Sequence, residues 1–178
     1  MEKRLALLLF IFLNLTSTFA QSISYSSEEM ERILQVKTVG GIILLESLFA
    51  IEKNGKLFFP LNDFFESTGL SINLSSEKLM GEGYVVHEDN PIRINFNECH
   101  FEYKGKVQSF DCGHYFESAE GLFASTELLE QMLPMKINID LLASLVFIES
   151  EVTLPPVAKL MRDKRKIFNY VEDEGEKE

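Results

Sequence analysis

The hydrophobic residues at the start of the chain form one block instead of an alternating pattern. After a charged beginning, an unbroken apolar run covers residues 5–13, and a less apolar stretch ends in a small side chain at Ala20. This order of segments is typical of a cleavable signal peptide, and it predicts cleavage between Ala20 and Gln21. The alternative is a transmembrane anchor, but a helical span needs about 20 apolar residues. Residues 1–20 are therefore predicted to be removed on export.

Beyond residue 39, apolar residues occur in short runs, and these runs are separated by residues typical of turns. Strand formers dominate positions 42–52, and the following Asn54-Gly55 pair is typical of a two-residue hairpin turn. Residues 56–59 then predict the returning strand. No later run reaches spanning length, so the mature chain is predicted to have no transmembrane segment.

A helix is predicted directly after this hairpin. Pro60 is suited to a first helical turn, and the apolar side chains over 61–68 recur at spacings of three and four residues. Gly69 stands where a C-cap glycine belongs, and residues 70–74 alternate as the next strand.

The same order of elements recurs 65 residues later in the chain. Residues 122–123 match the strand, Ser125 is a helix N-cap residue, Pro134 follows the helix, and 135–139 alternate. The sequence thus predicts an α+β fold, a small pseudo-symmetric domain from two strand–helix–strand units plus a central β-hairpin section.

The flanks of this domain have a polar composition. Residues 21–38 are predicted to be a flexible N-terminal arm, in which residues 28–34 are a candidate for a short helix. The globular domain is predicted to cover 39–153. Residues 154–178 are predicted to be a Pro-Pro and basic linker with a disordered acidic tail, and the basic stretch at 159–166 is either a solvated tail or a junction.

Two cysteines, Cys99 and Cys112, flank a predicted hairpin whose turn is Lys104-Gly105. In this register Cys99 faces Phe110, and Cys112 lies one diagonal step further on the same face. A small bulge would bring the two sulfurs into bonding range, so one disulfide is predicted. Two buried free thiols are the alternative.

Composition narrows the classes of partner. The formal net charge of −11 argues against binding to nucleic acid and to anionic membranes. Fifteen Phe and no Trp indicate a Phe-rich core. The sequon that begins at Asn73 matters only in a host that glycosylates its proteins.

Candidate chemistry is sparse. His87, His100 and His114 lack the spacing of a metal site, and solvated or capping roles fit them better. Cys112 and His114 are close enough to suggest a thiol nucleophile, although a bonded cysteine beside a turn is the simpler interpretation. No phosphate-binding loop or nucleophile elbow occurs, so no catalytic residue, cofactor or metal is predicted.

Several segments together resemble the N-terminal periplasmic region of usher-like proteins, which are outer-membrane assembly platforms for fimbriae. The resemblance covers roughly residues 44–166. The segments that carry it are 56–61, 69–74, 81–86, 92–96, 107–110, 122–125, 128–129, 133–134, 137–140 and 154–156, followed by Arg162 and Arg165. The duplicated strand–helix–strand unit is also similar to the copper amine oxidase N-terminal-like domain, a stalk module without catalytic residues of its own.

The usher-like resemblance implies an exported, non-catalytic protein-binding module in the periplasm or cell envelope. Its implied partners are periplasmic chaperone–subunit complexes or an outer-membrane barrel. An usher continues into a large barrel, whereas this chain ends at residue 178, so the resemblance implies either the periplasmic part of an usher or a truncated usher. The alternative is a stand-alone envelope or stalk domain that binds cell-wall or surface proteins.

Overall fold

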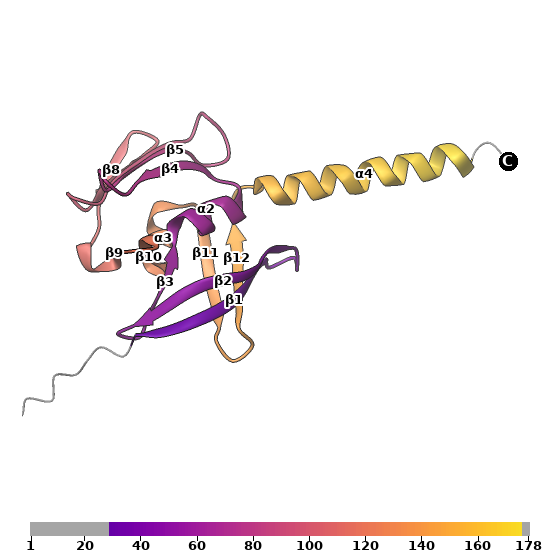
Figure 1. The fold of residues 1–178 in the computed structure, drawn as a ribbon. Helices are drawn as coiled ribbons and strands as arrows, with labels where there is room; N and C mark the ends of the chain where they lie inside the picture. Colours follow the sequence, from indigo (N-terminus) through magenta and orange to yellow (C-terminus); the bar gives the residue numbers. More distant parts are fainter. Residues whose placement is uncertain (1–28, 176–178) are drawn as a thin grey trace, which may run out of the picture.

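The computed structural model describes residues 29–175, with side chains as far as residue 166. Two β-sheets and three α-helices make up this part of the chain, and strands dominate it (Figure 1). The seven-stranded sheet has the order β11-β12-β1-β2-β3-β10-β9. Its strands are β1 (Met30–Thr38), β2 (Ile43–Lys53), β3 (Lys56–Pro60), β9 (Tyr115–Ser118), β10 (Gly121–Ser125), β11 (Met135–Asp140) and β12 (Leu145–Ser150).

The five-stranded sheet is an antiparallel meander inserted between β3 and β9. Its strands are β4 (Ser71–Ser75), β5 (Met80–Tyr84), β6 (Pro91–Asn95), β7 (His100–Tyr103) and β8 (Lys106–Ser109). One hydrophobic core joins both sheets to helices α2 (Leu61–Thr68) and α3 (Thr126–Met132). Ala50 from the large sheet, Phe64 from α2, Leu129 from α3 and Ile94 from the small sheet are all fully buried in it.

The predicted helix starts and stops are confirmed. Helix α2 follows Pro60, and Gly69 adopts the left-handed conformation with φ 71° at its C-cap. At the start of α3, the Ser125 hydroxyl accepts a hydrogen bond from the Leu128 N–H. This bond satisfies one of the amides that a helix leaves free at its N-terminus.

The two strand–helix–strand units exist, but their pseudo-symmetry is not confirmed. Strands β3 and β10 pair antiparallel, with Phe59 opposite Ala124, two residues that are 65 positions apart. The strands after the helices then diverge, because β4 joins the five-stranded sheet and β11 joins the seven-stranded sheet.

The cysteine hairpin forms in the predicted register. Strands β7 and β8 pair around the Lys104-Gly105 turn, and the Phe110 N–H donates to the Cys99 carbonyl oxygen. A 3-10 turn, η1 (Cys112–His114), brings the second cysteine back, and a disulfide joins Cys99 to Cys112 across a Cα–Cα distance of 5.4 Å.

The predicted flexible arm is wrong for residues 30–38, which form strand β1. This strand pairs antiparallel with β2 and parallel with β12, so it lies inside the sheet. Its Leu34 and Val36 are buried, and an Arg32–Glu52 ion pair of 2.7 Å ties it to β2. The burial of alternate side chains outweighs the polar composition on which the arm was predicted.

The predicted linker and disordered tail are also wrong for most of their length, because helix α4 covers Pro155–Gly175. Proline is tolerated in the first turn of a helix, where its missing N–H would have no partner in any case. The Lys, Leu, Met and Arg residues that follow are good helix formers. Figure 1 shows α4 projecting away from the two sheets.

The predicted signal peptide and its cleavage site between Ala20 and Gln21 lie outside the described residues, as do positions 21–28 of the predicted arm. Within residues 29–175, no helix is long and apolar enough to cross a membrane.

Candidate protein-interaction surface

The three histidines lie in separate places. His87 is in the turn after β5, with its Nδ1 atom 3.0 Å from an Asp89 oxygen, and His100 is on β7. His114 ends η1 and faces Ser125. The described residues contain no group of three His, Cys, Asp or Glu side chains that could hold a metal ion. Cys112 is bonded to Cys99, so its sulfur is not a free thiol beside His114.

His114 and Ser125 belong to a short polar chain at the start of α3. The His114 Nδ1 atom is 2.6 Å from the Ser125 hydroxyl oxygen, and its Nε2 atom is 3.3 Å from the Lys56 ammonium. Every donor is satisfied if Lys56 donates to Nε2 and the imidazole N–H donates to Ser125. A hydrolytic base would need the opposite tautomer facing the serine. Ser125 is also fully buried, so the group serves as a helix cap.

Glu127 extends this polar chain. Partial burial alone would raise the pKa of Glu127, but hydrogen bonding to its own backbone and to Ser125 lowers it. The nearby His114 and Lys56 lower it further, and the resulting pKa is below the ordinary carboxyl value. An ionised carboxylate in the first turn also suits the positive end of the helix dipole.

Four phenylalanines form a second apolar cluster on the seven-stranded sheet. Phe49, Phe58 and Phe123 each lie between two buried core residues of their strand, so they point to the opposite face. The rings of Phe116 and Phe123 stack at 5.1 Å, and Phe58 meets Phe116 edge-on at 5.1 Å. We call these four residues, with Ile33 and Ile51, the phenylalanine face.

The phenylalanine face is partly open to solvent. Phe123 and Phe58 are buried beneath their neighbours, but Phe49 and Phe116 are only half-buried, and Ile33 is 60% exposed. None of its members belongs to the core that α2 and α3 cover. The Lys53 ammonium lies 5.2 Å from the centre of the Phe116 ring. The surface is therefore an aromatic patch with a cation at its border, on an otherwise acidic protein.

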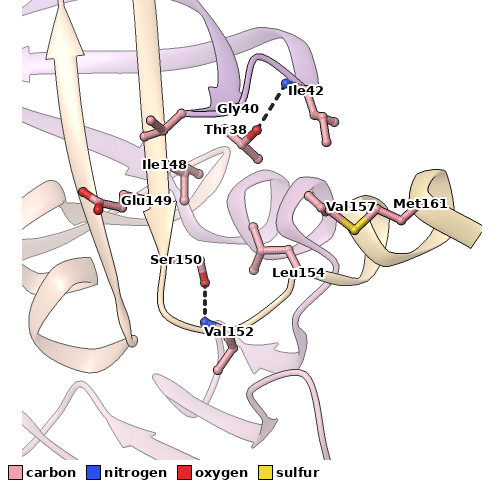
Figure 2. A pocket seen from close by; sticks show the side chains of 11 residues that line it. Thr38, Gly40, Ile42, Ile148, Glu149, Ser150, Val152, Leu154, Val157 and Met161 are labelled. Atoms are coloured by element: carbon pink, nitrogen blue, oxygen red, sulfur yellow. Dashed lines mark hydrogen bonds between the residues drawn. The ribbon is translucent and has the colours of Figure 1, made fainter.

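A separate apolar groove lies beside the first turns of α4 (Figure 2). It has a volume of about 270 Å³. The β1–β2 turn, the end of β12 and α4 contribute its walls. We call it the root groove; its lining residues are Thr38, Val39, Gly40, Ile42, Ile148, Glu149, Ser150, Val152, Leu154, Val157 and Met161.

Two hydrogen bonds stabilise the turns that line the root groove. The Ile42 N–H donates to the Thr38 hydroxyl at 3.2 Å, and the Val152 N–H donates to the Ser150 hydroxyl at 3.3 Å (Figure 2). Val39 is 62% exposed at the groove and Met161 is 55% exposed. The apolar lining therefore continues outward along the helix.

The start of α4 packs on the end of α2. A Cβ atom added to Gly69 would stand 2.9 Å from Pro155 Cβ and 2.9 Å from Pro156 Cδ. The glycine thus permits both the left-handed C-cap of α2 and the close approach of the two prolines.

Neither apolar surface was predicted from the sequence. A signal for the phenylalanine face was present, since Phe58 and Phe123 alternate with the core residues on both sides of them. These residues were predicted only as strands, and no second face was assigned to them. The root groove had no local signal, because it joins segments more than 100 residues apart.

Comparison with known proteins gives no relative. No family model, no curated protein and no solved structure matches the chain.

Proposed function

We propose that this chain is an exported, non-catalytic protein-binding module, and that it acts as the periplasmic part of an usher-like fimbrial assembly protein. Its partners are then periplasmic chaperone–subunit complexes or an outer-membrane barrel. The disulfide between Cys99 and Cys112 supports the exported location, since such bonds persist in oxidising compartments.

The phenylalanine face is the observation that carries the proposal. Phe49 and Phe116 keep part of their surface in water beside the exposed Ile33, and exposed apolar patches mark sites of protein association. Aromatic side chains are enriched at the centre of protein interfaces because each removes a large area from water at little cost in conformational entropy.

The usher-like segments of the sequence support the identity of the partner. Four of them, at 56–61, 69–74, 122–125 and 137–140, correspond to strands and caps around α2 and α3 in the structure. The His114–Ser125 contact, the closest approach to a catalytic pair, is a buried helix cap. A role in binding fits these residues better than turnover of a substrate.

Binding of the purified protein to a chaperone–subunit complex from the same organism tests the proposal. Ile33→Lys places a charge on the β1 side of the patch, beside Phe49, and should weaken binding at least tenfold, because burying an isoleucine contributes about 2 kcal/mol. Ile33 is 60% exposed, so the substitution leaves the core intact.

Val107→Lys is the matched control. Val107 is 66% exposed, but it lies on β8 at the edge of the other sheet. The Val107→Lys variant should therefore bind the complex as tightly as the unchanged protein. Absence of binding to any chaperone–subunit complex or usher barrel of the host would overturn the proposed partner. Equal losses in the two variants would overturn the role of the phenylalanine face.

A further inference from the structure

Helix α4 has little covering beyond its first turn. It spans Pro155–Gly175, which corresponds to about 31 Å, and Figure 1 shows it extending away from the body. All its described side chains from Lys159 to Lys166 are exposed. Val157, Leu160 and Met161 share one face at spacings of three and four residues. A helix with such a stripe normally packs against a second surface.

The first part of this helix, residues 155–166, has a charge opposite to that of the body. Residues 155–166 contain five Lys or Arg and one Asp, a net charge of +4. Residues 29–154 contain nine Lys or Arg and 20 Asp or Glu, a net charge of −11. The exposed part of α4 is therefore complementary to the acidic surface of the same protein.

A hollow of suitable chemistry lies on the body next to the root of α4. Its volume is about 470 Å³, and we call it the root hollow; its lining residues are Leu44, Leu45, Ser47, Asp63, Glu66, Ser67 and Pro156. Leu44 and Leu45 contribute apolar lining to the hollow, and Asp63 and Glu66, which are both exposed, contribute carboxylates.

The spacing of charges on the two elements matches. Asp63 and Glu66 are three residues apart on α2, and Arg162 and Arg165 are three residues apart on α4. Each pair is therefore displaced by about 4.5 Å along its helix axis. Two arginines at this spacing can meet two carboxylates at the same spacing.

The helix cannot reach its own root hollow. Arg162 and Arg165 lie about 9 and 14 Å beyond Pro156 along a continuous helix, and that direction leads away from the body. Only the hollow of another molecule is available to them. Because the hollow and the helix root are adjacent, a two-fold arrangement lets each copy fill the hollow of the other.

We propose that two copies of this chain associate through α4, with the first half of each helix lying over the root hollow of the other. Met161 then covers Leu44 and Leu45, while Arg162 and Arg165, which lie within about 100° of Met161 around the helix, face the carboxylates of the hollow. This association is independent of the partner proposed for the phenylalanine face.

Analytical ultracentrifugation measures this association. The full chain is expressed, and the purified protein is studied at roughly 1 to 200 μM, because these concentrations are on the order of the Kd of a weak homodimer. Reversal of the helix charges by Arg162→Glu with Arg165→Glu should weaken it at least tenfold. Reversal of the hollow by Asp63→Lys with Glu66→Lys should do the same. Lys104→Glu with Lys106→Glu, at the exposed β7–β8 turn, is the control and should leave it unchanged.

Mixing the two reversed proteins is the decisive measurement. The acidic helix of one then meets the basic hollow of the other, and the remaining helix and hollow keep their original charges, so a heterodimer should form where each protein alone does not. Circular dichroism shows whether each variant is folded. A wild-type protein that stays monomeric at 200 μM in low salt overturns the proposal, as does a mixture that stays monomeric.

Discussion

The disulfide between Cys99 and Cys112 offers a quantitative test of how this fold is stabilised. It joins the turn before β7 to η1, and so ties the five-stranded sheet to the segment that leads back into the large sheet. The sequence separation is 13. For a loop of this length, the loss of chain entropy in the unfolded state contributes about 3 kcal/mol to stability.

The free energy contributed by the disulfide can be converted into a change in Tm. The described part of the chain is about 150 residues long, and a domain of that size loses about 0.3 kcal/mol per degree at its midpoint. Reduction of the bond should therefore lower Tm by about 10 °C. The fold should survive, because Ile94 and Phe101 on the same sheet, and Phe96 directly after β6, remain fully buried apolar side chains of the core.

Calorimetry with and without a reducing agent measures the shift, and a double Cys99→Ala and Cys112→Ala variant separates its causes. The variant should melt about 10 °C or more below the oxidised protein, since Cys99 is also a buried side chain. Its Tm should not respond to reductant. An unchanged Tm on reduction of the wild-type protein would refute the entropic reasoning, and complete unfolding at 25 °C would refute the independence of the core.

Two further predictions concern single residues. Gly83→Ala should lower the free energy of unfolding by about 2–4 kcal/mol, because its Cβ would clash with the Ser71 carbonyl oxygen and stand 2.8 Å from Ile72 Cα. Gly40→Ala is the control, since its Cβ would lie 3.7 Å from the nearest atom. Thermal melting of the two variants checks the prediction, and equal Tm values would contradict it. Glu127→Gln should lower Tm by roughly 1–2 °C at pH 6–8. Because the pKa of Glu127 is lowered on folding, its contribution to stability is present above the ordinary carboxyl pKa and is lost as pH falls through the lowered value, so the gap in Tm should narrow as pH falls below the ordinary carboxyl pKa. A gap that widens in acid would reverse the assigned direction.

Local signals allowed much of the fold to be predicted. The Asn54-Gly55 and Lys104-Gly105 turns, the Gly69 C-cap and the Ser125 N-cap each act within a few residues, and the structure forms all four. The register of the cysteine hairpin followed from its turn, and the disulfide followed from the register.

The elements that depend on distant partners were missed. Strand β1 has a polar flank, and its neighbours in the sheet are β2 and a strand more than 100 residues away. The Pro155-Pro156 pair was interpreted as the end of the domain, although it also suits the first turn of a helix. The phenylalanine face needs the pairing of β9, β10, β3 and β2, which no single segment of the sequence specifies.

The position of β1 also has a consequence for the order in which the molecule can assemble. The first strand of the domain pairs in parallel with the last, through Gln35 to Thr38 and Leu145 to Ile148. A chain synthesised from its N-terminus can form the β1–β2 hairpin early. The backbone hydrogen-bonding groups on the other edge of β1 have no partner until residues 145–148 pair with it. Such non-local pairing slows folding and leaves a strand edge open to other chains. During synthesis from the N-terminus this interval spans almost the whole domain, so the β1 edge is the part of the fold that stays open to pairing with other chains for longest.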